Sequence, residues 1–308
     1  KSTVAFTDQS LPLDKLDKSR SVNIEDTFLI NPVSIEYHPK GYLIFLDSQS
    51  DYLVKILNIN TGTVQKIVRK GRGPNECIHI SKISVVNNDV WLHEPALRKM
   101  LRLKIDTLGF FGITEELNMG IQAGKFVALT NDLFVGTPFT RDRVAYFNRK
   151  GDLICRAGGF PKNINLSEGD GILPNVVFQT KITASPDGKY VALANLDVDV
   201  LEIYSNKGDT ICLLSGPDGI ETTVKPRHTG VGSTFPLDPL FFTYRDIKAL
   251  PNEIWASYAG IEIKKGEMPD EIFPNKIYCF SWYGKPIRKI ELGHRILSFA
   301  VDSKNPLD

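Results

Sequence analysis

The chain has 308 residues, of which 42% are hydrophobic and 24% are charged, a composition typical of a folded globular domain. Its 37 Lys and Arg residues are balanced by 36 Asp and Glu residues, which excludes the strongly basic surface of a nucleic-acid-binding protein. The longest apolar runs have the length of a strand, so no segment is predicted to span a membrane. None of the four cysteines lies in a CxxC pair, and free structural thiols are therefore predicted.

The first 32 residues contain three short apolar runs that are strand candidates, Thr3–Phe6, Val22–Ile24 and Thr27–Ile30. They precede the first complete repeat of the pattern described next. We therefore expect this segment to complete the last repeat, which would join the two ends of the chain and remove an open sheet edge.

From Val33 to Glu291 the chain repeats one pattern five times. In each unit a short apolar run is followed by a turn, a second apolar run, a loop, a third run, a glycine turn and a fourth run. The first turns end at Gly41, Asn88, Asn131, Gly188 and Asn252, and the glycine turns lie at Gly62, Gly109, Gly151, Gly208 and Gly284. Four of the five spacings between these turns are 20 or 21 residues, and the fifth is 32.

Four short strands in roughly 40–50 residues are the signature of a propeller blade. One such sheet cannot bury both faces alone, so the units must stack around an axis. No window has the apolar period of a helix. The sequence predicts an all-β fold, a single six-bladed β-propeller domain over residues 1–308 with four-stranded antiparallel blades. Five full blades span about residues 33–291.

The sixth blade is predicted from residues 296–308 together with the N-terminal residues 1–32, so that the N-terminal segment closes the ring. Ile296–Val301 is a good innermost strand, and a turn follows it before the chain stops. Either the N-terminus supplies three strands, or native sequence continues after Asp308. The second account is favoured because the blade otherwise lacks an obvious middle pair of strands.

The connections between the predicted strands are unequal in length. The long segments are 70–79, 158–179, 215–244 and 259–275, and the propeller topology places all of them on one face. Loops held by a rigid scaffold are where binding residues concentrate. The sequence therefore predicts that this long-loop face, around the mouth of the central channel, is the working surface.

Charged residues on this face, from the long segments, from the loops between second and third strands and from around the longest insertion, form the predicted binding site: Arg72, Glu76, Arg98, Arg141, Arg143, Arg227, His228, Arg245 and Asp246. Several arginines converging on one mouth would suit a carboxylate, sulfate or phosphate group. Solvated loop charges and loop-anchoring ion pairs are the alternative interpretation. The alternating Asp197 and Asp199 could hold a cation, or simply face solvent at a strand edge.

No motif predicts catalysis, a cofactor or a metal. A G-x-S-x-G elbow is absent, the five histidines are scattered, and Gly71–Glu76 lacks the Lys-Ser/Thr of a phosphate loop. The channel-facing runs at 83–86, 126–129 and 182–185 are mostly apolar or small, which leaves only Asp246 and the distant Glu36 to hold a cation.

Three segments together are similar to the TolB-like six-bladed propeller family, in which envelope lipoproteins of Bacteroidetes are frequent: residues 71–76, 182–192 and 275–286. The Gly-x-Gly-Pro-x-Glu loop is the most specific of the three. The resemblance implies an exported protein, in the periplasm or on the outer membrane, with a lipid anchor upstream of Lys1. It supplies no catalytic residues.

The leading hypothesis is a non-catalytic propeller of the bacterial cell envelope that binds a ligand or a protein, peptide or glycan partner on the long-loop face. The chain is expected to be a monomer without a nucleic-acid partner. The alternative is a channel-site hydrolase or lyase that uses a bound cation. Converging Asp, Glu, Asn or His groups at the mouth would favour the enzyme, whereas arginines and aromatic residues such as Phe139 would favour binding.

Overall fold

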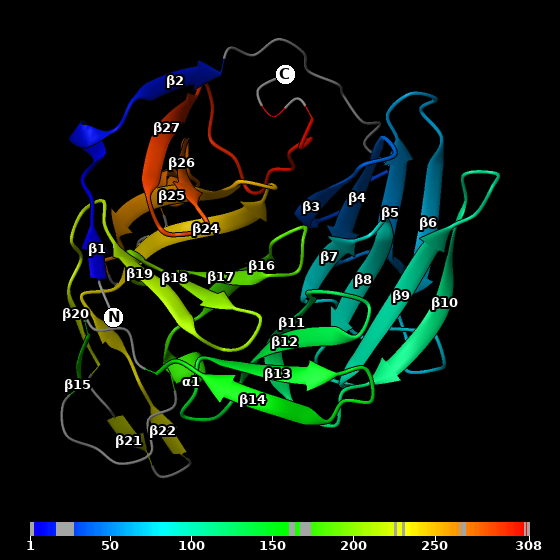
Figure 1. Cartoon of the computed structure of the whole chain (residues 1–308), viewed down its shortest axis with the longest axis horizontal. Coiled ribbons are helices and arrows are strands. Elements are labelled where there is room, and N and C mark those ends of the chain that lie inside the picture. Colours follow the sequence, from blue (N-terminus) through cyan, green and yellow to red (C-terminus); the bar gives the residue numbers. More distant parts are fainter. Residues whose placement is uncertain are drawn as a thin grey trace.

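The computed structural model describes residues 3–16, 28–159, 164–166, 174–224, 227–229, 232–264, 266, 269–304 and 306. Five antiparallel blades surround a central axis, with the first strand of each blade innermost (Figure 1). The propeller architecture predicted from the turn spacing is therefore confirmed. All five hairpin glycines have positive φ, between 72° and 89°, which is the conformation that these tight turns require.

The blades follow one another along the chain, and each is built from four consecutive main strands. Blade one contains β3 (Pro32–His38), β4 (Tyr42–Asp47), β5 (Tyr52–Asn58) and β6 (Val64–Arg69). Blade two contains β7 (Lys82–Val86), β8 (Asp89–Glu94), β9 (Lys99–Ile105) and β10 (Phe111–Asn118). Blade three contains β11 (Ala123–Ala128), β12 (Leu133–Pro138), β13 (Val144–Asn148) and β14 (Leu153–Ala157). Blade four contains β16 (Thr180–Ala184), β17 (Tyr190–Asn195), β18 (Val200–Ser205) and β19 (Thr210–Ser215). Blade five contains β24 (Phe241–Ala249), β25 (Glu253–Glu262), β26 (Lys276–Ser281) and β27 (Pro286–Leu292).

The hydrophobic core lies between the blades, in successive layers. Ile44 of blade one and Leu92 of blade two belong to one buried cluster, and Trp91 and Phe126 join blades two and three in the next. Further layers join blade three to blade four and blade four to blade five. Alternating side chains of each strand therefore face opposite neighbours, and stacking buries both faces of blades two to four, whereas the other face of blade five packs against the C-terminal residues Ile296, Phe299 and Val301.

Two N-terminal strands extend existing blades. β1 (Thr3–Ala5) pairs in parallel with β19, and β2 (Leu13–Leu16) pairs in parallel with β27. A short 3₁₀ turn, η1 (Asp8–Ser10), separates them. The predicted strand at Thr3–Phe6 is thus present, whereas Val22–Ile24 lies outside the described residues. Among those residues there are five blades, and the sixth blade with its closure by the N-terminal segment stays a prediction.

The C-terminal segment lies between the last blade and the first (Figure 1). The Ile35 amide donates to Ser298 Oγ at 3.3 Å, and Ser298 in turn donates to Asp246 of β24. The Tyr37 hydroxyl donates to Asp302 at 3.0 Å. Residues 298–302 therefore join blade five to blade one, although they are not in strand conformation.

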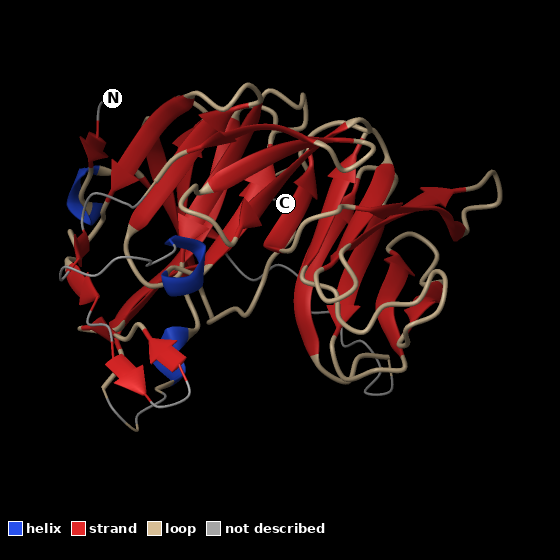
Figure 2. Ribbon diagram, turned by 90° about the horizontal axis from the view of Figure 1, so that it is seen from below, coloured by secondary structure: helices blue, strands red, loops and turns tan. Residues whose placement is uncertain are grey.

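The long connections carry small elements of their own. Between blades three and four lie β15 (Ile164–Leu166) and α1 (Pro174–Val177), and η2 (Asp270–Ile272) lies within blade five. The connection from blade four to blade five holds β20 (Thr222–Val224), β21 (Arg227–Thr229), β22 (Gly232–Thr234) and β23 (Leu237–Asp238). The β21–β22 hairpin projects beyond one face of the ring, at the lower left of Figure 2. Within the described part of the chain, no helix has the length and apolar character needed to cross a bilayer.

Candidate functional site

Four lysines lie on the inner strands of consecutive blades. Lys82 is the first residue of β7, Lys125 is in β11, Lys181 is in β16 and Lys248 is in β24. These strands pack against one another in that order around the axis. We call the four residues the lysine ring. Their convergence gives the channel a concentration of positive charge that the near-neutral composition of the chain does not reveal.

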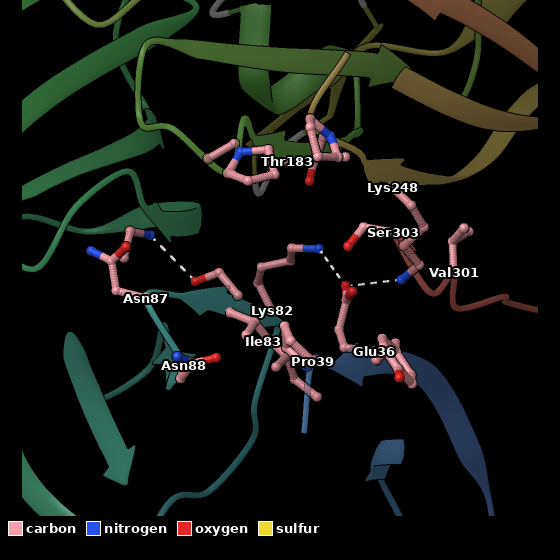
Figure 3. A pocket seen from close by; sticks show the side chains of 18 residues that line it. Glu36, Pro39, Lys82, Ile83, Asn87, Asn88, Thr183, Lys248, Val301 and Ser303 are labelled. Carbon is pink, nitrogen blue, oxygen red and sulfur yellow. Dashed lines mark hydrogen bonds and ion pairs between the residues drawn. The ribbon is translucent and has the colours of Figure 1, made fainter. Parts of the chain in front are cut away.

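One half of the lysine ring is ion-paired. Glu36 of β3 accepts from Lys82 Nζ at 3.0 Å and from Lys248 Nζ at 2.9 Å, so the two ammonium groups approach one carboxylate from opposite sides (Figure 3). Lys248 also contacts Asp246 Oδ2 at 3.3 Å and donates to the Ile35 carbonyl at 2.7 Å. Burial lowers the pKa of Lys248, but these two carboxylates outweigh it and raise the pKa above its usual value.

A cavity of about 230 Å³ opens beside this paired half, toward the short turns of the blades. Its walls include Glu36, Lys82 and Lys248, together with turn residues such as Asn88 and Pro186. Because the cations here already have partners, the cavity offers little uncompensated charge to a ligand.

The other half of the lysine ring is unpaired. Lys125 and Lys181 make no side-chain hydrogen bond or ion pair with any residue that the structure describes. Burial, with help from Lys181 and Lys82, lowers the pKa of Lys125 to about 8. Burial also lowers the pKa of Lys181; Asp246 opposes this, and Lys82 and Lys248 add to it. An ammonium group that is partly withdrawn from water without an ion-pair partner is costly, and the described residues of this half of the channel include two.

Lys125 opens into a second cavity of about 310 Å³, which we call the Lys125 pocket. It lies between the start of blade three and the segment around α1, on the long-loop side. The wall combines apolar and polar side chains: Gly124, Lys125, Thr137, Phe139, Asn175, Val176, Phe178, Gln179 and Thr180. An unpaired cation beside aromatic rings suits a ligand with an anionic group and an apolar body.

The α1 wall of this pocket is fixed by Asn175. Its amide nitrogen donates to the Pro138 carbonyl at 2.7 Å and to the Asp142 carbonyl at 3.0 Å. Its amide oxygen accepts from Arg143 Nη1 at 2.8 Å. A short helix of four residues could not hold this position by its own backbone bonds, so these contacts set the shape of the pocket.

The structure places Arg143 away from the channel mouth, fully buried at 0% exposure. Its guanidinium pairs with Glu202 at 2.8 Å and donates to Asn195 at 2.8 Å. Such a bidentate buried pair is complete without a ligand. Arg143 therefore joins blade three to blade four and supports the pocket wall through Asn175.

Arg72 and Glu76 lie in the Gly71–Glu76 loop, where Arg72 is exposed and Glu76 is half-buried. The Gly73 amide donates to Glu76 Oε2 at 2.9 Å. A Cβ at Gly71 would lie 2.0 Å from the same oxygen, which explains why glycine occupies this position. The carboxylate thus shapes its own loop.

The remaining predicted residues lie on several different elements. Arg98 is exposed in a turn with φ of 55°, and Arg141 is exposed on the loop after β12. Arg245 stacks on the Phe242 ring at 4.4 Å, and Asp246 is buried against Ser298 and Lys248. The backbones of Arg227 and His228 lie in the β21–β22 hairpin, and their side chains are outside the described part of the structure. A role of these nine residues in binding stays a prediction.

The two aspartates considered as a cation site have separate partners. Asp199 accepts from the backbone amides of Asp218 at 3.0 Å and Ile220 at 3.1 Å, while Asp197 accepts from the Gln179 amide at 3.3 Å. Burial raises the pKa of each carboxyl to about 6. Across the described ranges, no group of three or more His, Cys, Asp or Glu side chains could hold a metal ion.

Sequence reasoning missed Lys125 and Lys181, although a signal was present. The channel-facing runs considered above begin at residues 83, 126 and 182, and a lysine stands immediately before each of them. A lysine repeated at one place in three successive inner strands is a pattern that the turn spacing makes visible.

Comparison with known proteins gives the family and the fold. The family model described as "TolB-like 6-blade propeller-like" matches residues 13–304. A member of the DUF4221 family from Bacteroides vulgatus is similar in structure, with a TM-score of 0.55 and 12% identity over 86% of this chain and 82% of that one. A candidate exported protein from Bacteroides fragilis has a TM-score of 0.50 and 12% identity over 91% of this chain and 77% of that one. A search of the curated proteins finds no match.

Proposed function

We propose that this chain, which belongs to the TolB-like 6-blade propeller-like family, is a non-catalytic binding propeller that takes a small carboxylate ligand in the Lys125 pocket. The observation that carries the proposal is the pair of lysines, Lys125 and Lys181, that make no ion pair with a described side chain, and of the two only Lys181 has a carboxylate, Asp246, near enough to favour its charged form. A bound carboxylate would supply that charge.

The surroundings of Lys125 define the rest of the ligand. Phe139 is 40% exposed and Val176 is 47% exposed, so apolar surface is available to cover an aromatic or aliphatic body. A volume of about 310 Å³ is near the lower end for small-molecule pockets, which favours a compact ligand or the terminal group of a larger one. A peptide carboxylate or an acidic sugar of a glycan would both present the required group.

The alternative, a channel enzyme that uses a bound cation, has less support. Lysine ammonium groups repel a divalent cation, and the carboxylates nearest to them, Glu36 and Asp246, are already paired with Lys82 and Lys248. The same charges that disfavour a metal attract an anion.

Export to the cell envelope is part of the proposal. A structural neighbour from Bacteroides fragilis is described as a candidate exported protein. We expect this chain to be exported as well, with a lipid anchor upstream of Lys1. Fractionation of cells should place it with the periplasm or the outer membrane, and recovery in the cytoplasm would contradict this part.

We also propose that the ring has six positions, five filled by the blades and the sixth by the C-terminal segment. Residues 298–302 join β24 to β3, where the innermost strand of a sixth blade would stand. Hydrogen exchange should then show slow exchange for the Phe299 amide, which donates to Asp246 at 3.3 Å. Exchange as fast as in a free peptide would count against the bridge.

The binding proposal is tested by calorimetry with benzoate, using benzamide as a neutral probe of the same shape. Benzoate should bind and benzamide should not. Replacing Lys181→Met should weaken benzoate binding by about tenfold or more, because a hydrogen bond to a charged group contributes roughly 1.5–3 kcal/mol. Lys189→Met is the matched control, since this exposed lysine pairs with Asp187 at 3.0 Å outside the pocket. Equal binding of benzoate and benzamide would refute the proposal.

A further inference from the structure

Lys125 differs from the other members of the lysine ring in its surroundings. Lys82 and Lys248 are held by carboxylates, and Lys181 has Asp246 close enough to favour its charged form. Lys125 has only cations nearby and opens into the Lys125 pocket. The amine is therefore both accessible to a small molecule and poorly stabilised as an ammonium ion.

We propose that Lys125 is a nucleophilic amine that captures a carbonyl compound in the Lys125 pocket as a reversible imine. This rests on the proposed function in that both use the same pocket, and it names an aldehyde-bearing or ketone-bearing carboxylate as the preferred occupant. Two conditions activate lysine for this chemistry, removal of its ammonium ion from water and a neighbouring positive charge. Lys125 meets both, through its partial burial near the start of β11 and through Lys181 and Lys82.

The step requires no co-reactant. The lone pair of neutral Nζ attacks the carbonyl carbon, a C–N bond forms, and the carbonyl π electrons move to oxygen, which takes one of the two Nζ protons. The carbinolamine then loses its hydroxyl group and the nitrogen proton as one water molecule, leaving C=N. Addition of water reverses the sequence and releases the ligand, so the chain binds the carbonyl compound covalently without changing its oxidation state.

Different side chains would contact the different parts of such a ligand. Lys181, on the adjacent inner strand β16, is the unpaired cation available to a carboxylate. Phe139 and Phe178 line the pocket beside Lys125 and would enclose the carbon skeleton. A compound with its carbonyl and carboxylate on one compact apolar frame satisfies all three groups.

The test traps the imine by reduction. The full chain is incubated at pH 7.5 with 4-carboxybenzaldehyde and sodium cyanoborohydride, and the modified peptide is located by mass spectrometry. We expect one major adduct on Lys125, formed at least about tenfold faster than on Lys189, because a larger fraction of Lys125 is neutral at this pH. Benzaldehyde, which lacks the carboxylate, should label Lys125 more slowly.

The Lys125→Arg variant retains the positive charge but cannot form an imine, because a guanidinium is not deprotonated in proteins. It should lose the adduct, with circular dichroism confirming the fold. Adducts spread over surface lysines in proportion to their exposure would overturn the inference. The inference would also be overturned if the chain binds benzoate but Lys125 is not modified by the aldehyde. In that case the proposed carboxylate-binding function stands. Selective labelling of Lys125 without benzoate binding would instead support the amine chemistry and count against the carboxylate-binding function.

Discussion

Blade three contains one fully buried cation, Arg143, and one half-buried cation, Lys125, and within the described ranges only the first has an ion-pair partner. Arg143 is enclosed between blades and has Glu202, Asn175 and Asn195 around its guanidinium. Lys125, on the inner strand of the same blade, has no partner among the described residues and lies beside two further lysines. The fold can therefore supply counter-charges where stability needs them. Unpaired cations at the channel are the kind of local conflict that marks functional sites.

The largest effect should come from breaking the complete pair. Arg143→Met leaves the Glu202 carboxylate buried without its partner, and we expect a loss of about 3–5 kcal/mol in the free energy of unfolding. Urea denaturation measures it. Arg141→Met is the control, because this neighbour is exposed and should change stability by less than about 0.5 kcal/mol. Similar stability of both variants would mean that the buried pair contributes little.

The stacked blades were predictable because their signal is local. Hairpin glycines, turn residues and apolar runs report strands and their order without knowledge of any distant contact. The pairing of β1 with β19 and of β2 with β27 was not predictable, since a short strand carries no information about which outer edge it will join. The 32-residue spacing of the fifth unit arises from the long strand β25 and from the connection to β26, which contains η2.

A smaller effect is expected at the paired half of the lysine ring. Glu36→Gln removes the charge shared by Lys82 and Lys248, and we expect a loss of roughly 1–3 kcal/mol in stability. The same change makes the channel more positive, so benzoate should bind more tightly. Denaturation and calorimetry on one sample measure both quantities. Weaker benzoate binding would show that Glu36 supports the pocket in some other way.

The candidate site was harder to predict than the fold, for a physical reason. Arginine is prominent in the loops, but its many donors are readily satisfied within the protein, as with Arg143, Glu202 and Asn195. Sequence shows which residues are charged and not which lack a partner. Lys125 and Lys181 became candidates only when the topology placed them on adjacent inner strands and the contacts showed no ion pair for either among the described residues.

The smallest effect is a pH dependence at Lys125. Its pKa in the folded chain is about 8, below the usual 10.5, so the folded state binds this proton less tightly than the unfolded state. Below pH 8 both states are protonated, and the folded state carries the full cost of the unpaired cation. Between about pH 8 and 10.5 the folded state loses the proton first, and stability from this group rises with pH.

Lys125→Met removes that cost at every pH. The variant should therefore be slightly more stable than the parent chain at pH 7, and its advantage should shrink as pH rises toward 10, measured by urea denaturation at each pH. The titratable groups that act on Lys125 or that it acts on are Lys82, Lys181, His93 and His79. Burial lowers the pKa of His93 to about 3 and also lowers the pKa of His79, so neither histidine changes its charge in this range. Subtracting the free energy of unfolding of the parent chain from that of the variant at each pH cancels the contributions of groups whose titration does not depend on Lys125. A constant difference across the range would mean that the Lys125 amine titrates as it would in water, and the contrast with Arg143 would then lose its basis.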